Sequence, residues 1–125
     1  MAICTSSAST KPRASRVARL AMTWERHPAT IGLVVGATAP AELAAIRGVA
    51  PRLPFLVPGV GAQGGDASST LAAGPAIIAG DDRPGGYLLV NVSRGIAAAA
   101  TGATDPGDAI ADAARRWAGD LQVLG

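Results

Sequence analysis

The sequence predicts an α/β fold in which parallel strands alternate with helices, and two observations lead to this prediction. Three short runs, residues 31–36, 55–57 and 87–92, are continuously apolar, as strands buried on both faces of a parallel sheet are. A helical pattern precedes the first run and another follows each run, which gives one helix and then three strand–helix units. With 125 residues, the chain has the size of a single domain.

The first helix is predicted from about residue 13 to residue 27. Its large apolar residues recur at the spacing of one helical face: Val17, Leu20, Ala21 and Trp24. Pro28 limits its end. Residues 1–12 are expected to be either an irregular tail or the remnant of an earlier strand. The first 24 residues contain no acid and several Ser and Arg, as transit peptides do, but the helical spacing favours an ordinary core-facing helix.

The second helix is predicted between residues 38 and 50. Thr38 is a candidate N-cap, Pro40 lies in the first turn, and Glu42 is placed near the positive end of the helix dipole. Pro51 closes this helix. A short third helix is predicted around residues 66–73, and residues 74–86 are predicted to be mostly loop.

The last helix has the clearest signals. Asp105 is a candidate N-cap, followed by Pro106 in the first turn and Asp108 near the helix dipole. One face is predicted to pack on the core: Ile110, Ala114, Trp117 and Leu121.

Composition narrows the classes of partner. Only 16% of residues are charged and the net charge is +2, and no Lys/Arg run is interleaved with aromatics, so nucleic-acid binding has little support. No apolar segment is long enough to span a bilayer, so no membrane partner is expected. A single cysteine, Cys4, permits no internal disulfide and is typical of a reducing cytoplasm. We expect a cytoplasmic protein without metal or cofactor.

The segment after the second apolar run has the composition of a phosphate-binding loop. Residues 58–66, here called the glycine loop, contain four glycines, the amide of Gln63 and no charge before Asp66. Backbone without Cβ atoms lets N–H groups crowd around an anion. Residues 59–64 also satisfy G-x-G-x-x-G, so a dinucleotide site with Asp81 or Asp82 as its acid is an alternative, as is a plain connection without ligand.

A second candidate follows the third apolar run, at Ser93-Arg94-Gly95. Arg94 would lie at the carboxyl end of a parallel strand, where α/β barrels place their sites, and its guanidinium can bind two phosphate oxygens together. The N–H groups of Gly95 and Ile96 would add donors if a short helix begins there. The alternative is a surface arginine paired with Asp81 or Asp82.

Four segments together resemble orotidine 5′-phosphate decarboxylase, most closely the branch common in actinobacteria: residues 31–38, 40–43, 58–66 and 91–96. The resemblance extends from about Val17 to Trp117. The family folds as a (β/α)₈ TIM barrel, and this chain matches its final three strand–helix units. The resemblance therefore implies that residues 13–125 form the C-terminal part of a barrel that decarboxylates orotidylate to UMP in pyrimidine biosynthesis.

The same resemblance assigns roles to individual residues. Gln63 and Arg94 would be the side-chain ligands of the nucleotide's phosphate, and Gly64, Gly65 and Gly95 would add backbone contacts. Pro58 and Val60 would line the pocket near the base. Ser6, in a segment similar to the end of the family's fifth strand, would read the pyrimidine, although Ser7 and Ala8 depart from the family's pattern there.

The family's catalytic motif, D-x-K-x-x-D, does not occur in this sequence. The single lysine, Lys11, has no flanking acid, so no residue can protonate the carbanion that decarboxylation leaves. A full barrel needs roughly 200 residues or more, so we expect a fragment with an uncovered apolar face that is inactive alone. Its partner would be a small nucleotide if the barrel is completed, and the family is dimeric. A non-catalytic phosphate or nucleotide binder is the alternative.

Overall fold

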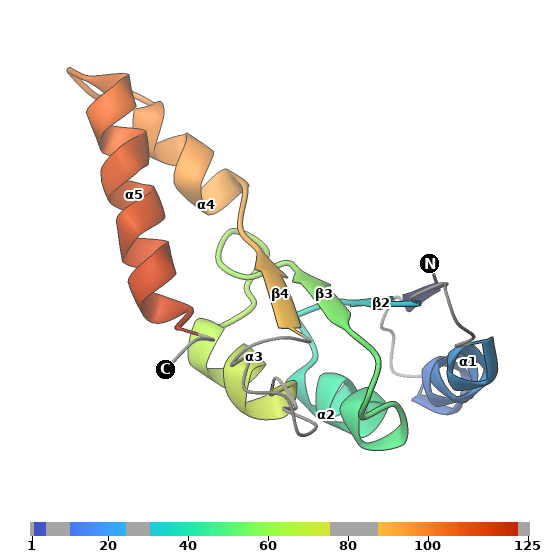
Figure 1. The fold of residues 1–125 in the computed structure, drawn as a ribbon. Coiled ribbons are helices and arrows are strands. Elements are labelled where there is room, and N and C mark those ends of the chain that lie inside the picture. Colours follow the sequence, from blue (N-terminus) through green and yellow to red (C-terminus); the bar gives the residue numbers. More distant parts are fainter. Residues whose placement is uncertain (1, 5–10, 25–30, 76–87, 123–125) are drawn as a thin grey trace.

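The computed structural model describes residues 2–4, 11–24, 31–75 and 88–122 (Figure 1). The strands are β1 (Ala2–Cys4), β2 (Leu33–Val35), β3 (Phe55–Pro58) and β4 (Leu88–Asn91). The helices are α1 (Lys11–Trp24), α2 (Pro40–Val49), α3 (Ala67–Ala73), α4 (Arg94–Ala97) and α5 (Pro106–Asp120), with a 3₁₀ turn, η1 (Ala98–Ala100), after α4.

The four strands form one parallel sheet in the order β1-β2-β3-β4. Three of them are the predicted strands: β2 and β4 are shorter than their apolar runs, and β3 extends one residue beyond its run. β1, at Ala2–Cys4, is a fourth strand within residues 1–12, where an earlier strand was one of the two expectations. Each successive strand pairs with the one before it, because the intervening helix returns the chain to the same end of the sheet. The predicted α/β architecture of strand–helix units is therefore confirmed.

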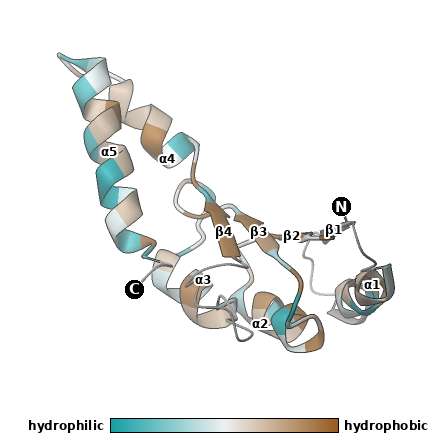
Figure 2. Ribbon diagram, in the orientation of Figure 1, coloured by the Kyte–Doolittle hydropathy of each residue, from teal (hydrophilic) through white to brown (hydrophobic). Residues whose placement is uncertain are grey.

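Among the described residues, helices cover one face of the sheet and nothing covers the other. Figure 1 shows α1, α2 and α3 along one face, while α4 and α5 extend beyond the β4 side. Phe55 and Val57 point toward the helices and are fully buried, whereas Leu89 on the opposite face of β4 is 67% exposed. Figure 2 shows the resulting concentration of apolar residues on the strands. The sequence predicted such an uncovered apolar face from the missing strands.

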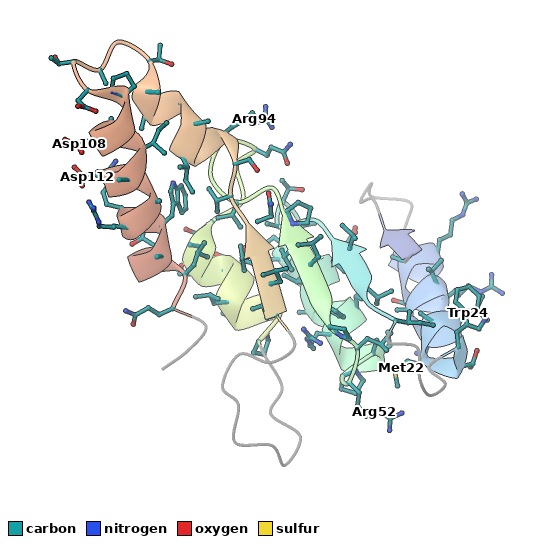
Figure 3. All side chains as sticks on the ribbon, turned by 45° about the horizontal axis from the view of Figure 1, so that its top comes forward. Met22, Trp24, Arg52, Arg94, Asp108 and Asp112 are labelled. Carbon is teal, nitrogen blue, oxygen red and sulfur yellow. The ribbon has the colours of Figure 1, made fainter. Side chains whose placement is uncertain are left out.

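The predicted packing face of α1 is only partly correct. Ala21 is buried as predicted, but the other buried residues among the described side chains of α1 are Ala14 and Ala18. Leu20 and Trp24 remain about half exposed, and Figure 3 shows Trp24 directed away from the sheet. Alanine lets the helix backbone approach the core closely, and the helix therefore packs through its smallest side chains. The last described residue of α1 is Trp24, and the predicted continuation to His27 lies outside the described residues.

One of the two predicted helix caps is confirmed, because Asp105 Oδ1 accepts a hydrogen bond from Asp108 N at 3.0 Å. Asp66, for which no cap was predicted, caps α3 by accepting from Ser69 N at 2.7 Å. The predicted Thr38 cap is wrong, because the N-cap of α2 is Ala39 and no side chain caps it. Pro40 instead begins the helix directly, which its fixed backbone angle favours.

Arg47 is a buried cation on the helix-covered side of the sheet. Its guanidinium lies 3.5 Å from the centre of the Phe55 ring, and its Nη1 donates to the Leu53 carbonyl at 2.8 Å. Burial lowers the pKa of Arg47 to about 10, so it stays protonated at neutral pH. The stacking over Phe55 joins α2 to the middle of the sheet.

The inner face of α5 was predicted in part. Trp117 and Leu121 are half-buried against the core, as the periodicity predicted, but Ala113 is the most buried residue and Ile110 is 39% exposed. Ile110 belongs to the first five residues of α5, and Figure 1 shows that end of the helix extending away from the sheet. Within the described ranges, no helix is long and apolar enough to cross a membrane.

Candidate phosphate-binding site

The two segments singled out in the sequence follow neighbouring strand ends. Pro58, the last residue of β3, is paired with Asn91, the last residue of β4. The glycine loop begins immediately after Pro58, and Arg94 begins α4 three residues after Asn91. Because parallel strands end at the same edge of a sheet, the loop and the arginine come together there.

The glycine loop is a compact turn that only glycine can form. Gly59, Gly61 and Gly64 have φ values of +97°, +80° and +89°, a region that other residues rarely enter. Gly61 N donates to Gly65 O and Gly64 N donates to Gly61 O, both at 2.8 Å, while Gly65 N donates to Gly59 O at 3.0 Å. A bridge between Val60 and Gly65 closes the turn. The loop is therefore fixed by its own backbone.

A hollow of about 200 Å³ lies between the loop and the start of α4. Its lining combines residues from both segments: Pro58, Gly59, Val60, Ala62, Gln63, Asn91, Ser93 and Arg94. Arg94 is the one charged side chain among these described lining residues, so the hollow is positive. Figure 3 shows Arg94 projecting from the first turn of α4. Pro58, Val60, Gln63 and Arg94, all assigned to the site from the sequence, share this hollow.

Polar groups beside Arg94 add to the site and were given no role by the sequence. Ser93 Oγ donates to Asn91 Oδ1 at 3.0 Å, and both residues line the hollow. Gln63 folds back over the loop, since a Cβ built at Gly59 would lie 2.9 Å from Oε1 of Gln63. The Asn91–Ser93 motif was visible in the sequence, but only the register of β4 shows that both side chains reach the hollow.

The glycines assigned to backbone contacts have structural roles here. Gly64, Gly65 and Gly95 do not line the hollow. The N–H groups of Gly64 and Gly65 donate hydrogen bonds to carbonyl groups within the loop itself. A Cβ at Gly65 would lie 2.6 Å from Ala37 Cβ and 2.6 Å from Gly59 O, so no larger residue fits. The predicted contacts of these glycines to phosphate stay predictions.

Arg94 is available to a ligand in the described part of the structure. Its side chain is exposed and makes no hydrogen bond or ion pair with any described residue, while Asp81 and Asp82, its alternative partners, lie outside the described residues. Ile96 N donates to Ser93 O at 3.1 Å. This N–H group is therefore already used within the start of α4 and is not free to make the predicted contact with a ligand. The N–H of Gly95 precedes the first intrahelical bond of α4, where a helix leaves donors unsatisfied.

Asp66 argues against a dinucleotide in the glycine loop. In a dinucleotide fold the pyrophosphate sits at the N-terminus of the helix after the loop. Here the Asp66 carboxylate occupies that position on α3, accepting from Ser69 N and from Ser68 Oγ, both at 2.7 Å. The backbone hydrogen bond from Ser69, with that from the Ser68 side chain, lowers the pKa of Asp66 to about 2. A fixed negative charge therefore stands where a pyrophosphate would bind.

Two further parts of the sequence-based site are not described. Ser6, assigned to the pyrimidine, lies outside the described residues, as do Asp81 and Asp82. Among the residues that are described, no group of three or more His, Cys, Asp or Glu side chains is placed to hold a metal ion.

Comparison with known proteins gives a consistent set of relatives. No family model matches the chain. It is 48% identical over 118 residues to orotidine 5′-phosphate decarboxylase of Halorubrum lacusprofundi, covering 87% of this chain and 41% of that protein. It is 51% identical over 102 residues to orotidine 5′-phosphate decarboxylase of Polaromonas naphthalenivorans, covering 82% of this chain and 32% of that protein.

Solved structures agree with these relatives. The chain superimposes on Leishmania donovani UMP synthase with a TM-score of 0.68 and 35% identity, covering 97% of this chain and 27% of that one. For Leishmania donovani OMP decarboxylase the TM-score is 0.60 and the identity 37%, covering 86% and 38%. The chain thus spans well under half the length of the proteins it matches. The predicted affinity to the actinobacterial branch is not tested by these relatives and stays a prediction.

Proposed function

Since this chain is a partial member of the orotidine 5′-phosphate decarboxylase family, we propose that it is the C-terminal, phosphate-binding part of such an enzyme. In this role it holds the phosphate of orotidylate or UMP and supplies no catalytic group of its own. As part of a pyrimidine-synthesising enzyme with one cysteine, it is proposed to work in the cytoplasm.

The convergence of Gln63 and Arg94 on one hollow is the observation that carries this proposal. They come from the ends of β3 and β4, which are adjacent in the sheet. In TIM barrels a phosphate site is frequently built by the loops after the last two strands and by a short extra helix. The glycine loop, Ser93-Arg94 and the four-residue α4 match that arrangement. The guanidinium would pair with two phosphate oxygens while the amide of Gln63 donates to a third.

The chemistry requires groups that these residues do not supply. Decarboxylation in this family uses a D-x-K-x-x-D array to oppose the substrate's carboxylate and to protonate carbon. The lone lysine, Lys11, begins α1 rather than following a strand. The uncovered face of the sheet, where Leu89 is 67% exposed, is the face that the remaining strands of a barrel would enclose. We therefore propose that catalysis needs a second part carrying the Asp/Lys array.

Titration calorimetry with UMP tests the phosphate role. The parent chain is expected to bind UMP, and Arg94→Ala is expected to abolish measurable binding because the one cation of the hollow is lost. Arg116→Ala is the matched control, since Arg116 is another exposed arginine that does not line the hollow. Equal binding by the Arg94→Ala and Arg116→Ala variants, or none by the parent chain, contradicts the proposal.

A further inference from the structure

Trp117 of α5 lies against both segments that form the phosphate site. A Cβ built at Gly61 would be 2.8 Å from Cζ2 and 2.9 Å from Cη2 of Trp117, and one built at Gly95 would be 3.1 Å from its Nε1. These distances are shorter than ordinary van der Waals contacts, so the indole rests directly on bare backbone at both places. Two glycines from separate parts of the chain meet the same ring.

These glycines stand next to the two side chains that the site depends on. Gly61 precedes Gln63 by two residues, and Gly95 directly follows Arg94. In the described structure, neither the Gln63 side chain nor the Arg94 side chain is held by a hydrogen bond or an ion pair. Their positions therefore depend on where the backbone of each segment is fixed.

The sheet itself does not fix the two segments relative to each other. Pairing between β3 and β4 ends at Pro58 and Asn91. Beyond that point, no hydrogen bond among the described residues joins residues 59–66 to residues 93–98. The indole is rigid, and its helix is attached to the core through Leu121 and to α4 by packing.

We propose that Trp117 is a positioning residue that sets the separation between Gln63 and Arg94 and thereby the affinity for phosphate. This inference rests on the phosphate site proposed above. The contact requires glycine on both sides, which gives Gly95 a reason to be glycine inside a helix, where glycine is otherwise unfavourable. A smaller side chain at position 117 leaves the loop and α4 free to separate. The phosphate can then be bound by Gln63 or by Arg94, but not by both at once.

The test compares Trp117→Leu with Leu121→Ala by calorimetry, with UMP and with inorganic phosphate as ligands. Both variants remove half-buried apolar contacts at the C-terminal half of α5, but the atoms nearest to a Cβ built at either glycine belong to Trp117 and not to Leu121. Trp117→Leu is expected to weaken UMP and phosphate binding about tenfold or more, the effect of losing one hydrogen bond to a charged group. Leu121→Ala is expected to lower the thermal midpoint without changing either affinity, and Trp117→Phe is expected to restore part of the lost affinity.

The outcomes separate this inference from the proposed function. No binding by the parent chain overturns both. Binding by the parent with equal affinity in Trp117→Leu, or an equal loss in Leu121→Ala, overturns the positioning role alone.

A second measurement tests the positioning role of Trp117 even if the Trp117→Leu variant does not fold. Trp24→Phe leaves Trp117 as the single tryptophan, because the chain has two. Its emission is expected to change saturably with UMP, with the dissociation constant found by calorimetry. Unchanged emission at saturating UMP contradicts the proposal.

Discussion

Replacing Gly61 with alanine should destabilise the fold in two ways, through backbone strain and through a clash with Trp117. The backbone at Gly61 has a φ of +80°, a conformation that costs a residue with a Cβ about 1–2 kcal/mol. The new methyl would also lie 2.8 Å from the Trp117 ring, and such overpacking costs about 1–3 kcal/mol. We expect Gly61→Ala to lower the free energy of unfolding by about 2–5 kcal/mol, a large part of the stability of a domain this size.

Gly64→Ala is the matched control within the same loop. Gly64 has nearly the same backbone angle, φ +89°, but a Cβ there would meet nothing within 4 Å. This variant should therefore show the conformational cost alone, about 1–2 kcal/mol. Urea denaturation followed by circular dichroism measures both. Equal destabilisation of the two variants within about 0.5 kcal/mol, or no recovery when Gly61→Ala is combined with Trp117→Leu, refutes the contact on which the reasoning depends.

Three further perturbations have defined outcomes. Phe55→Ala should lower the free energy of unfolding by about 3–5 kcal/mol in urea denaturation, because Phe55 is only 1% exposed and its ring lies under Arg47; a loss below about 1 kcal/mol would contradict this packing. Asp66→Ala should flatten the acid limb of the stability curve: a folded pKa lowered to about 2 gives stabilisation that is complete above the ordinary value of 3.8 and is lost as pH falls toward 2. Identical acid limbs for the Asp66→Ala variant and the parent chain would show that the cap does not titrate. Leu89→Ser should reduce self-association in sedimentation velocity with little change in the free energy of unfolding, since Leu89 is 67% exposed. Leu88→Ala, on the buried face, should instead lower the free energy of unfolding. The opposite pattern would mean that the apolar face carrying Leu89 is covered.

Strand positions and the location of the site were predictable because their signals are local. A continuous apolar run such as residues 55–57 can be read without knowing its neighbours, and an N-cap such as Asp105 acts within its own first turn. The convergence of Gln63 and Arg94 was also predictable, since both follow consecutive parallel strands. The sequence therefore indicated the edge of the sheet at which the hollow lies.

The remaining features depend on which neighbours are present. Leu20 and Trp24 follow the helical period of α1, yet the helix packs through Ala14, Ala18 and Ala21, because close approach favours small side chains over large ones. The N-cap of α2 is Ala39 rather than Thr38, since Pro40 already supplies the first-turn geometry. Similarly, only the packing of α5 brings Trp117 onto two glycines more than thirty residues apart. Periodicity identifies an apolar face but not its partner.

The proposal that this chain supplies the phosphate site and a second part supplies the catalytic groups is tested by measuring turnover of orotidylate by the chain alone and in a mixture. The second component is the part of the Halorubrum lacusprofundi relative that this chain does not match, which is expected to carry the D-x-K-x-x-D array. The loss of orotidylate absorbance is followed for each component and for the two together, with Arg94→Ala in the mixture as the control. Turnover is expected only in the mixture, and Arg94→Ala is expected to abolish it. Turnover by this chain alone, or turnover in the mixture that does not depend on Arg94, would contradict the proposal.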